Sequence, residues 1–71
     1  MYDSLKVVNK VAFYRKRCGI SQGELADLVG VSRNTICSIE RGHFNPSLIL
    51  AQKLSFALRV SFYNLFEFII S

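Results

Sequence analysis

The connection Gly30-Val31-Ser32, in the middle of the chain, constrains the fold more than any other part of the sequence. It joins two segments with apolar residues at helical spacing, Gln22–Val29 and Arg33–Arg41. Two helices joined by so short a turn must cross at a steep angle. We therefore expect a tightly bent helix pair, which places strict demands on the residues inside the bend.

Three positions of such a pair are restrictive, and each holds a residue that fits. Ala26 is small enough for close packing of the two helices, and Gly30 can adopt positive φ, where a Cβ atom would strain the turn. Ile36 fills the angle between the helices. Further apolar side chains for this contact come from Leu25, Val31 and Ile39. The combination predicts a helix-turn-helix.

Serines and glycines divide the rest of the chain into helices. A serine hydroxyl can accept a hydrogen bond from the free amides of a first helical turn, and the serines placed to do so are Ser21, Ser32, Ser47 and Ser61. Glu24 completes a capping box with Ser21. The predicted helices are Ser4–Cys18, Gln22–Val29, Arg33–Arg41, Leu48–Leu58 and Phe62–Phe68. No segment alternates in the way of a strand, so we expect an all-α fold.

The inward faces of these helices follow from helical spacing. In the first helix the inward residues are Val7, Val11, Tyr14 and Cys18. In the others they are Leu25, Ala26, Val29, Ile36, Ile39, Leu50, Leu54, Ala57 and Leu58. A chain of 71 residues has no room for a second core, so we expect residues 1–71 to form a single helix-turn-helix domain.

Composition excludes several classes of protein. With 51% hydrophobic residues, the chain is too apolar for a disordered tail. Two cysteines, Cys18 and Cys37, are too few for a disulfide scaffold. The longest uncharged stretch, Gly42–Gln52, is too short and too polar to span a bilayer, and we see no signal peptide. We expect a cytoplasmic protein with reduced thiols.

The net charge of +4 is concentrated near the N-terminus. Before residue 18 the only acidic residue is Asp3, against the cations Lys6, Lys10, Arg15, Lys16 and Arg17. Such a cluster suits a polyanion or an anionic membrane surface, and it is equally typical of a solvated helix face. Charge alone does not decide the function.

The motif extends into a resemblance to a known family. It is carried by Gly19–Ala26, Val29–Ile36, Ile39–Gly42, Asn45–Ser47 and positions between Lys53 and Phe66. Over residues 7–66 the chain resembles the DNA-binding domain of Cro and the phage repressors, the XRE-type family. The resemblance implies a five-helix, lambda-repressor-like fold and a regulator of transcription that binds double-stranded DNA. We expect no cofactor and no small-molecule effector domain.

In such a fold the second helix of the bent pair lies in the major groove, with its N-terminal part nearest the base edges. Arg33 can donate two hydrogen bonds to guanine O6 and N7, and Asn34 can pair in the same way with adenine. Cys37 and Ser38 follow one turn later. These four residues are the predicted base contacts.

The predicted phosphate contacts are Gln22, Ser32, Thr35, Arg41, His43 and Asn45. Gln22 opens a helix, where free amides favour an anion, and the resemblance gives it a contact to the DNA backbone. Ser32 acts first as a cap, and a solvated loop residue is the alternative for His43. The resemblance also pairs Arg15 with Glu40, which would lock the first helix to the DNA-reading helix.

Apolar residues exceed what the predicted core needs. The surplus comprises Phe13, Ile49, Phe56, Phe62, Phe68, Ile69 and Ile70. Large exposed apolar patches mark interfaces, so we expect a two-fold homodimer through the last two helices. Its interface would contain Ile49, Phe56, Phe62, Phe68, Ile69 and Ile70. The alternative is that the last helix folds its aromatic residues into one core.

The sequence offers little for functions other than DNA binding. Neither paired carboxylates nor a nucleophile beside His43 is present at useful spacing, so we expect no enzyme. Cys18, Cys37 and His43 lack the spacing of zinc ligands, so we expect no metal, and a redox role for Cys37 is a weaker alternative. The main rival is a protein-interaction module such as an antitoxin. Membrane binding by the basic first helix would need the apolar face of Val7, Val11 and Tyr14, which the core also needs.

Overall fold

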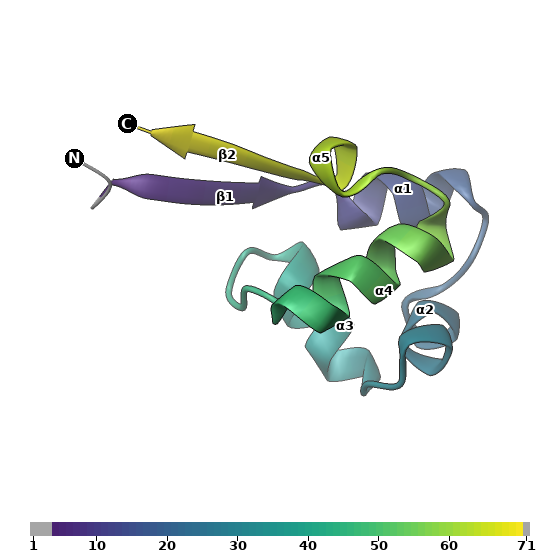
Figure 1. The fold of residues 1–71 in the computed structure, drawn as a ribbon. Coiled ribbons are helices and arrows are strands. Elements are labelled where there is room, and N and C mark those ends of the chain that lie inside the picture. The colour runs from purple at the N-terminus through teal and green to yellow at the C-terminus, as the bar shows by residue number, and fades with distance from the viewer. Residues whose placement is uncertain (1–3, 71) are drawn as a thin grey trace.

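The computed structural model describes residues 4–70, which form five helices and a two-stranded antiparallel sheet (Figure 1). In chain order the elements are β1 (Leu5–Asn9), α1 (Val11–Arg17), α2 (Gln22–Val29), α3 (Arg33–Glu40), α4 (Leu48–Leu58), α5 (Phe62–Leu65) and β2 (Phe66–Ile70). The helices form one body, and the sheet projects from it beside α5. Asp3, counted above with the N-terminal charges, lies outside the described residues.

The middle of the chain follows the sequence prediction closely. Helices α2 and α4 have the predicted bounds, and α3 ends one residue early, with Arg41 as its C-cap. All four predicted serine caps are confirmed. In each, the hydroxyl accepts a hydrogen bond from the amide three residues later, at 3.0–3.2 Å, and the caps are Ser21, Ser32, Ser47 and Ser61. Local capping therefore fixes the starts of α2 to α5.

The core lies where the helices of the body meet. Its largest fully buried side chains are Leu25, Ile36, Ile39, Leu54, Leu65 and Val11. Burying each Leu or Ile side chain stabilises the fold by about 1.5–3 kcal/mol. Leu50 and Ala57, predicted to face inward, are half-buried and pack against this core. Phe66, which the helical spacing did not place in the core, is buried in it.

The expectation of an all-α fold is wrong at both ends of the chain. The segment expected to begin the first helix forms β1, so α1 is much shorter than predicted. Helix α5 ends at Leu65, and the residues expected to continue it to Phe68 form β2. The two strands pair antiparallel, from Leu5 opposite Ile70 to Asn9 opposite Phe66.

The strands escaped prediction because their exposed face mixes apolar with charged residues. Val7 and Asn9 are half-buried, whereas Val8 between them is exposed, so the alternation exists in burial and not in residue type. On the same outer face, Ile69 of β2 is exposed as well. β-branched and aromatic residues favour strands once a partner strand is available. Here that partner comes from the opposite end of the chain.

Asn9 joins the sheet to the helices. Its Nδ2 donates a hydrogen bond to the carbonyl oxygen of Ile39 at 2.8 Å, and its Oδ1 accepts one from the amide of Val11 at 3.1 Å. The amide of Lys10 donates to the carbonyl oxygen of Leu65 at 2.8 Å. These bonds hold the base of the sheet against the end of α3 and the start of α1.

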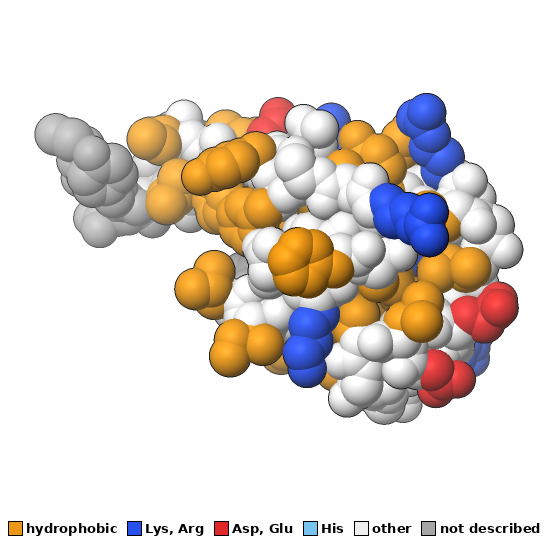
Figure 2. All heavy atoms as spheres, turned by 45° about the vertical axis from the view of Figure 1, so that its right-hand side comes forward, with side chains coloured by type: hydrophobic (Ala, Val, Ile, Leu, Met, Phe, Trp, Pro, Cys, Tyr) orange, Lys and Arg blue, Asp and Glu red, His pale blue; other side chains and the backbone are white. Residues whose placement is uncertain are grey.

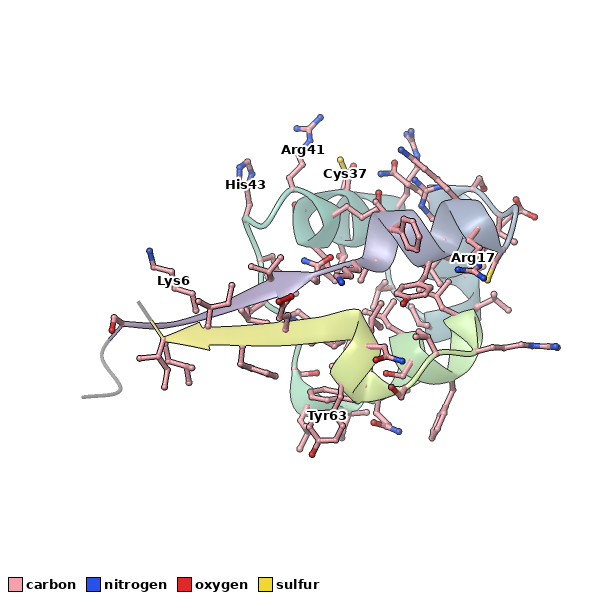
Figure 3. All side chains as sticks on the ribbon, turned by 90° about the horizontal axis from the view of Figure 1, so that it is seen from above. Lys6, Arg17, Cys37, Arg41, His43 and Tyr63 are labelled. Carbon is pink, nitrogen blue, oxygen red and sulfur yellow. The ribbon has the colours of Figure 1, made fainter. Side chains whose placement is uncertain are left out.

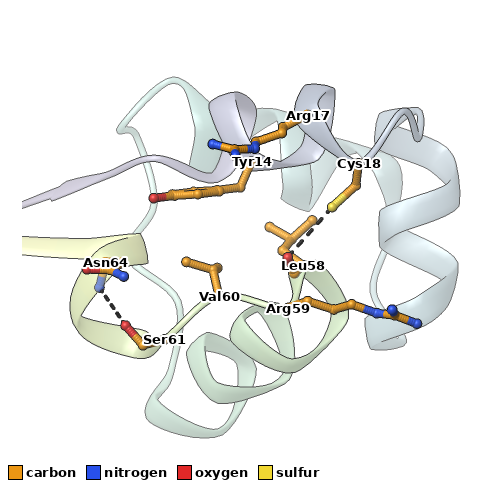
Figure 4. Close-up of a pocket in the computed structure, with 8 residues that line it drawn as sticks. All are labelled: Tyr14, Arg17, Cys18, Leu58, Arg59, Val60, Ser61 and Asn64. Atoms are coloured by element: carbon orange, nitrogen blue, oxygen red, sulfur yellow. Dashed lines mark hydrogen bonds between the residues drawn. The ribbon is translucent and has the colours of Figure 1, made fainter.

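Cys18 is exposed, contrary to the expectation that it packs near the core. Cys18 is the C-cap of α1, and its side chain borders solvent at the end of this helix. Its Sγ donates to the carbonyl oxygen of Leu58 at 3.6 Å, beside a hollow of about 490 Å³ between α1 and the α4–α5 connection (Figure 4). None of the helices in residues 4–70 is both long and apolar enough to cross a membrane.

Candidate nucleic-acid interface

The bent pair α2–α3 has the geometry that its turn residues require. Gly30 has φ 76°, and its amide donates to the carbonyl oxygen of Ala26 at 2.9 Å. Val31 donates to the same oxygen at 3.0 Å. Ala26 is 2% exposed and Ile36 is fully buried, as expected for the contact between the two helices. The inward side of α3 is thereby held in the core, which leaves its other side to solvent.

The outward side of α3 carries the four predicted base contacts. Arg33 and Asn34, at its first turn, are exposed, and Cys37 and Ser38 are half-buried one turn later. Cys37 points away from the body of the molecule (Figure 3). The side chains with forked hydrogen-bonding groups therefore lie at the helix end that can enter a groove most deeply, and their contacts to bases stay predictions.

The loop after α3 continues this surface. The amides of Arg41 and His43 donate to the carbonyl oxygens of Cys37 and Ser38 at 3.1 and 3.0 Å, which ties the loop to the helix. Arg41, His43 and Asn45 are exposed. Arg41 and His43 extend to the same side of the molecule as Cys37 (Figure 3). Arg41 and His43 thus border the predicted base contacts, and Asn45 follows them in the loop.

Thr35 and Ser32 bond to each other before any ligand binds. Ser32 Oγ accepts from the amide of Thr35 at 3.2 Å and lies 3.0 Å from Thr35 Oγ1. A hydroxyl binds a phosphate oxygen by donating its single proton, and one of these two protons is used in the bond between Ser32 and Thr35, so the other can still be donated to a phosphate. Their predicted phosphate contact therefore requires no loss of the helix cap.

A hydrogen-bonded network fixes α1, α2 and α3 relative to one another. Arg15 Nε lies 2.7 Å from Glu40 Oε2, and Nη2 lies 3.2 Å from Oε1. Arg15 Nη1 also donates to the carbonyl oxygen of Ile20 at 2.9 Å. Gln22 Nε2 donates to Glu40 Oε1 at 3.0 Å. The amide of Gln22 has a second N–H, so it can hold Glu40 and still contact a phosphate.

In this network the interaction between Arg15 and Glu40 favours the charged form of both side chains. Burial acts to raise the pKa of Glu40, but hydrogen bonds from Arg15 and Gln22, with the charges of Arg15 and Lys16, outweigh it and lower that pKa. The hydrogen bond to Glu40 raises the pKa of Arg15. In the capping box, hydrogen bonds from Ser21 lower the pKa of Glu24. The Arg15–Glu40 pair is therefore ionised at neutral pH, with side chains only 12% and 8% exposed.

Phe44 belongs to this surface although the sequence analysis did not select it. It is 44% exposed. A shallow hollow of about 320 Å³ is lined by Asn34, Thr35, Ser38, His43 and Phe44. The signal in the sequence was a lone aromatic residue within a polar loop, between His43 and Asn45. Its ring gives the surface an apolar element that a thymine methyl group or a sugar could contact.

The predicted dimer residues differ in exposure. Ile49 and Phe56 on α4 are 71% and 73% exposed, and the β2 residues Phe68, Ile69 and Ile70 are between 43% and 59% exposed. Phe62 is half-buried, with its ring 5.2 Å from that of Phe66. Figure 2 shows apolar side chains gathered over the sheet and the neighbouring part of the body. Part of the aromatic surplus thus joins the core, and the rest remains exposed.

Residues 4–70 contain no group of three His, Cys, Asp or Glu side chains that could hold a metal ion. Cys37 and Cys18 are both free thiols. The surface around α3 offers hydrogen-bond donors, acceptors and positive charge, which is the chemistry of nucleic-acid recognition.

Comparison with known proteins identifies the same motif. The family model described as helix-turn-helix matches residues 11–65. An HTH-type transcriptional regulator of Methanothermobacter thermautotrophicus is 51% identical over 45 residues, which are 63% of this chain and 65% of that protein. The regulator YgzD of Bacillus subtilis is 43% identical over 58 residues, 82% of this chain and 88% of that protein.

A longer relative and two solved structures are similar to the same part of this chain. The regulator SinR of Bacillus subtilis is 39% identical over 59 residues, 82% of this chain, which spans about half of SinR (53%). The restriction-modification controller protein C.AhdI of Aeromonas hydrophila has a TM-score of 0.73 at 34% identity, over 78% of this chain and 80% of that one. The hypothetical transcription factor NHTF of Neisseria has a TM-score of 0.72 at 33% identity, over 78% and 63%.

The matched residues contain the capped helix pair, the glycine turn and the Arg15–Glu40 network. The resemblance to the XRE-type family is thereby confirmed, and this chain belongs to the helix-turn-helix family of DNA-binding transcriptional regulators.

Proposed function

We propose that this protein is a transcriptional repressor that binds an inverted-repeat operator as a homodimer, with α3 of each protomer in the major groove. The observation that carries the proposal is the division of α3 into two sides. Ile36 and Ile39 are fully buried, and Arg33 and Asn34 are exposed on a helix that the core holds in place. A helix presented in this way reads base edges with its N-terminal turn.

Recognition would divide between bases and phosphates. Arg33 and Asn34 can each make a bidentate contact, worth about 1–3 kcal/mol of discrimination against a wrong base. The residues around them position the helix on the backbone without reading sequence. These positioning residues are Gln22, Ser32, Thr35, Arg41, His43 and Asn45. The cysteine and serine of the second turn, Cys37 and Ser38, have shorter reach and would contact bases only at close approach.

The exposed apolar residues support the dimer. Ile49 and Phe56 on α4 and three residues of β2 remain in solvent in the monomer, as described above. A two-fold interface would remove them from water and place the two copies of α3 about one helical turn of DNA apart, roughly 34–36 Å. Such a dimer represses by occupying DNA that the transcription machinery needs. C.AhdI, similar in fold over most of this chain, is described as a controller protein, which fits a regulator of this size.

Selection of bound oligonucleotides from a random pool tests the proposal. We expect an inverted repeat, and mobility shift with the selected duplex should show one complex that contains two protomers. Sedimentation of the free protein at micromolar concentration should show a dimer. A strict monomer that selects a single half-site would overturn the homodimer, and failure to bind any duplex at low salt would overturn DNA binding.

A protein-interaction module such as an antitoxin is the alternative that the exposed apolar surface favours. Salt titration separates the two, because each phosphate neutralised lowers the logarithm of affinity by about 0.9 per log unit of salt. Apolar protein contacts would show little of this dependence.

A further inference from the structure

Lys6 of the terminal sheet extends toward the same side of the molecule as three of the predicted DNA contacts. In Figure 3, Lys6 of β1 extends toward the same edge as Cys37 of α3 and as Arg41 and His43 of the following loop. Tyr63 of α5 extends toward the opposite edge. The strand that carries Lys6 is therefore on the side of the molecule that α3 would present to DNA.

The position of β1 relative to α3 is fixed by hydrogen bonds. Asn9, at the end of β1, donates to the carbonyl oxygen of Ile39 in the last turn of α3 at 2.8 Å. Lys6 lies three residues before Asn9, which is about 10 Å at roughly 3.3 Å per residue of strand. Lys6 is thus held at a set distance beyond the C-terminal end of α3.

The surface between Lys6 and the loop after α3 is continuous. A hollow of about 420 Å³ is lined by Lys6, Gly42 and Asn45, together with Leu5, Val7 and Phe68. Asn45 is one of the predicted phosphate contacts, and Arg41 precedes Gly42 in the same loop. Lys6 therefore lies next to the loop that carries predicted phosphate contacts.

The ammonium group of Lys6 is available for an anion. Within residues 4–70 the ion pair found is that of Arg15 with Glu40, and Lys6 takes no part in it. Lys6 is exposed, opposite the apolar Ile69, and the nearest acid by register is Glu67, two positions along β2 on the same face. Within residues 4–70, Glu67 forms no ion pair with Lys6, so the ammonium group can approach a DNA phosphate.

We infer that Lys6 contacts a DNA phosphate flanking the segment that α3 reads, so that β1 lengthens the footprint on DNA beyond the helix-turn-helix. The inference rests on the proposed DNA binding. As a flexible point charge, Lys6 would add affinity and salt dependence without adding sequence preference. The alternative role is that of an exposed lysine that prevents the sheet edge from pairing with other chains.

The test compares Lys6→Gln with Arg59→Gln, a loss of the same charge beside the hollow between α1 and the α4–α5 connection, which no residue of α3 lines (Figure 4). The probe is a 30-base-pair duplex, a length on the order of three helical turns, that carries the sequence selected by the unmodified protein. For each protomer whose Lys6 contacts DNA, Lys6→Gln should reduce the slope of log affinity against log salt by about 0.9. The affinity deficit of Lys6→Gln relative to wild type should then shrink by about 3.5-fold per protomer between 50 and 200 mM salt.

Three further measurements make the result decisive. Lys6→Arg should restore the slope, the sequence selected by Lys6→Gln should be unchanged, and trimming the flanks of the duplex should make wild type and Lys6→Gln equal. Thermal unfolding of each variant controls for folding. Equal slopes for wild type and Lys6→Gln on the long duplex, or an equal loss in Arg59→Gln, would overturn the inference and leave the proposed function intact. If the wild type itself binds no duplex, the proposed function fails first.

Discussion

The helix pair α2–α3 and the terminal sheet β1–β2 differ in how they are stabilised. In the helix pair, Leu25, Ile36 and Ile39 are fully buried, and each helix begins at its own serine cap. In the sheet, Val8 and Ile69 remain 46% and 43% exposed. A two-stranded sheet alone is marginally stable in water. The comparison indicates that the core and its own caps hold the helix pair in place, whereas the sheet depends on what it packs against.

This difference suits a regulator that must place a few side chains against base edges. The position of Arg33 is set by a capped helix whose other side is in the core. The sheet needs less precision, because its proposed roles are burial against a second copy and contact with a phosphate.

Removing the side chain that fills the bend should have the largest effect. Ile36→Ala leaves a cavity in a fully buried site and should lower the free energy of unfolding by about 2–5 kcal/mol. Leu28→Ala, on the exposed side of α2 at 64% exposure, is the matched control and should change it by less than about 0.5 kcal/mol. Urea denaturation measures both. Equal losses of unfolding free energy in the two variants would show that packing inside the bend does not stabilise the helix pair α2–α3.

Breaking the network between α1 and α3 should come next. Glu40→Ala leaves Arg15 and Gln22 without their acceptor and should destabilise the fold by approximately 3 kcal/mol, since the pair is largely buried. Glu24→Ala removes an exposed capping-box carboxylate and should have a smaller effect. Comparable melting temperatures for the two variants would contradict a stabilising role for the pair.

The same network predicts a pH dependence. The pKa of Glu40 is lowered in the folded protein, so on acidification the unfolded chain takes up its proton first. The stabilisation is complete above the usual glutamate pKa of 4.5 and is lost as pH falls through the lower folded value. The gap in melting temperature between wild type and Glu40→Gln should therefore narrow below about pH 4.5. A gap independent of pH would count against the assigned network.

Hydrogen exchange should separate the two regions without any substitution. The amides of β1 and β2 should exchange through local opening, much faster than the amides of α2 and α4 that pack on the core. Dimer formation or DNA binding should slow exchange in the sheet by a larger factor than in the core helices. Sheet amides as protected as those of α2 in the free monomer would contradict the contrast.

The sequence was a good guide wherever structure is determined locally. The serine caps, the glycine at the bend and helical spacing predicted α2, α3 and α4, because each signal acts within a few residues of the element that it sets. The family resemblance implied that Arg15 pairs with Glu40. The structure confirms this pair.

The sheet could not be predicted in the same way. Val7 and Phe68 pair across almost the whole chain, and neither segment has an apolar-polar alternation that marks a strand. Asn9, whose side chain bonds to both α1 and α3, looked like an ordinary polar position inside a helix. Phe44 and Lys6 were missed as neighbours of the predicted DNA contacts, because only the folded chain brings Phe44 beside α3 and Lys6 beside the loop that follows it.

The most direct test of the account is to repeat the oligonucleotide selection with Arg33→Ala. Because Arg33 is exposed and makes no contact with the core, the variant should fold as the wild type does. The account predicts that base preference is lost at one position of each half-site, with about 1–3 kcal/mol less discrimination there and the rest of the selected sequence retained. A selected sequence identical to that of the wild type would contradict the claim that the exposed turn of α3 reads the bases.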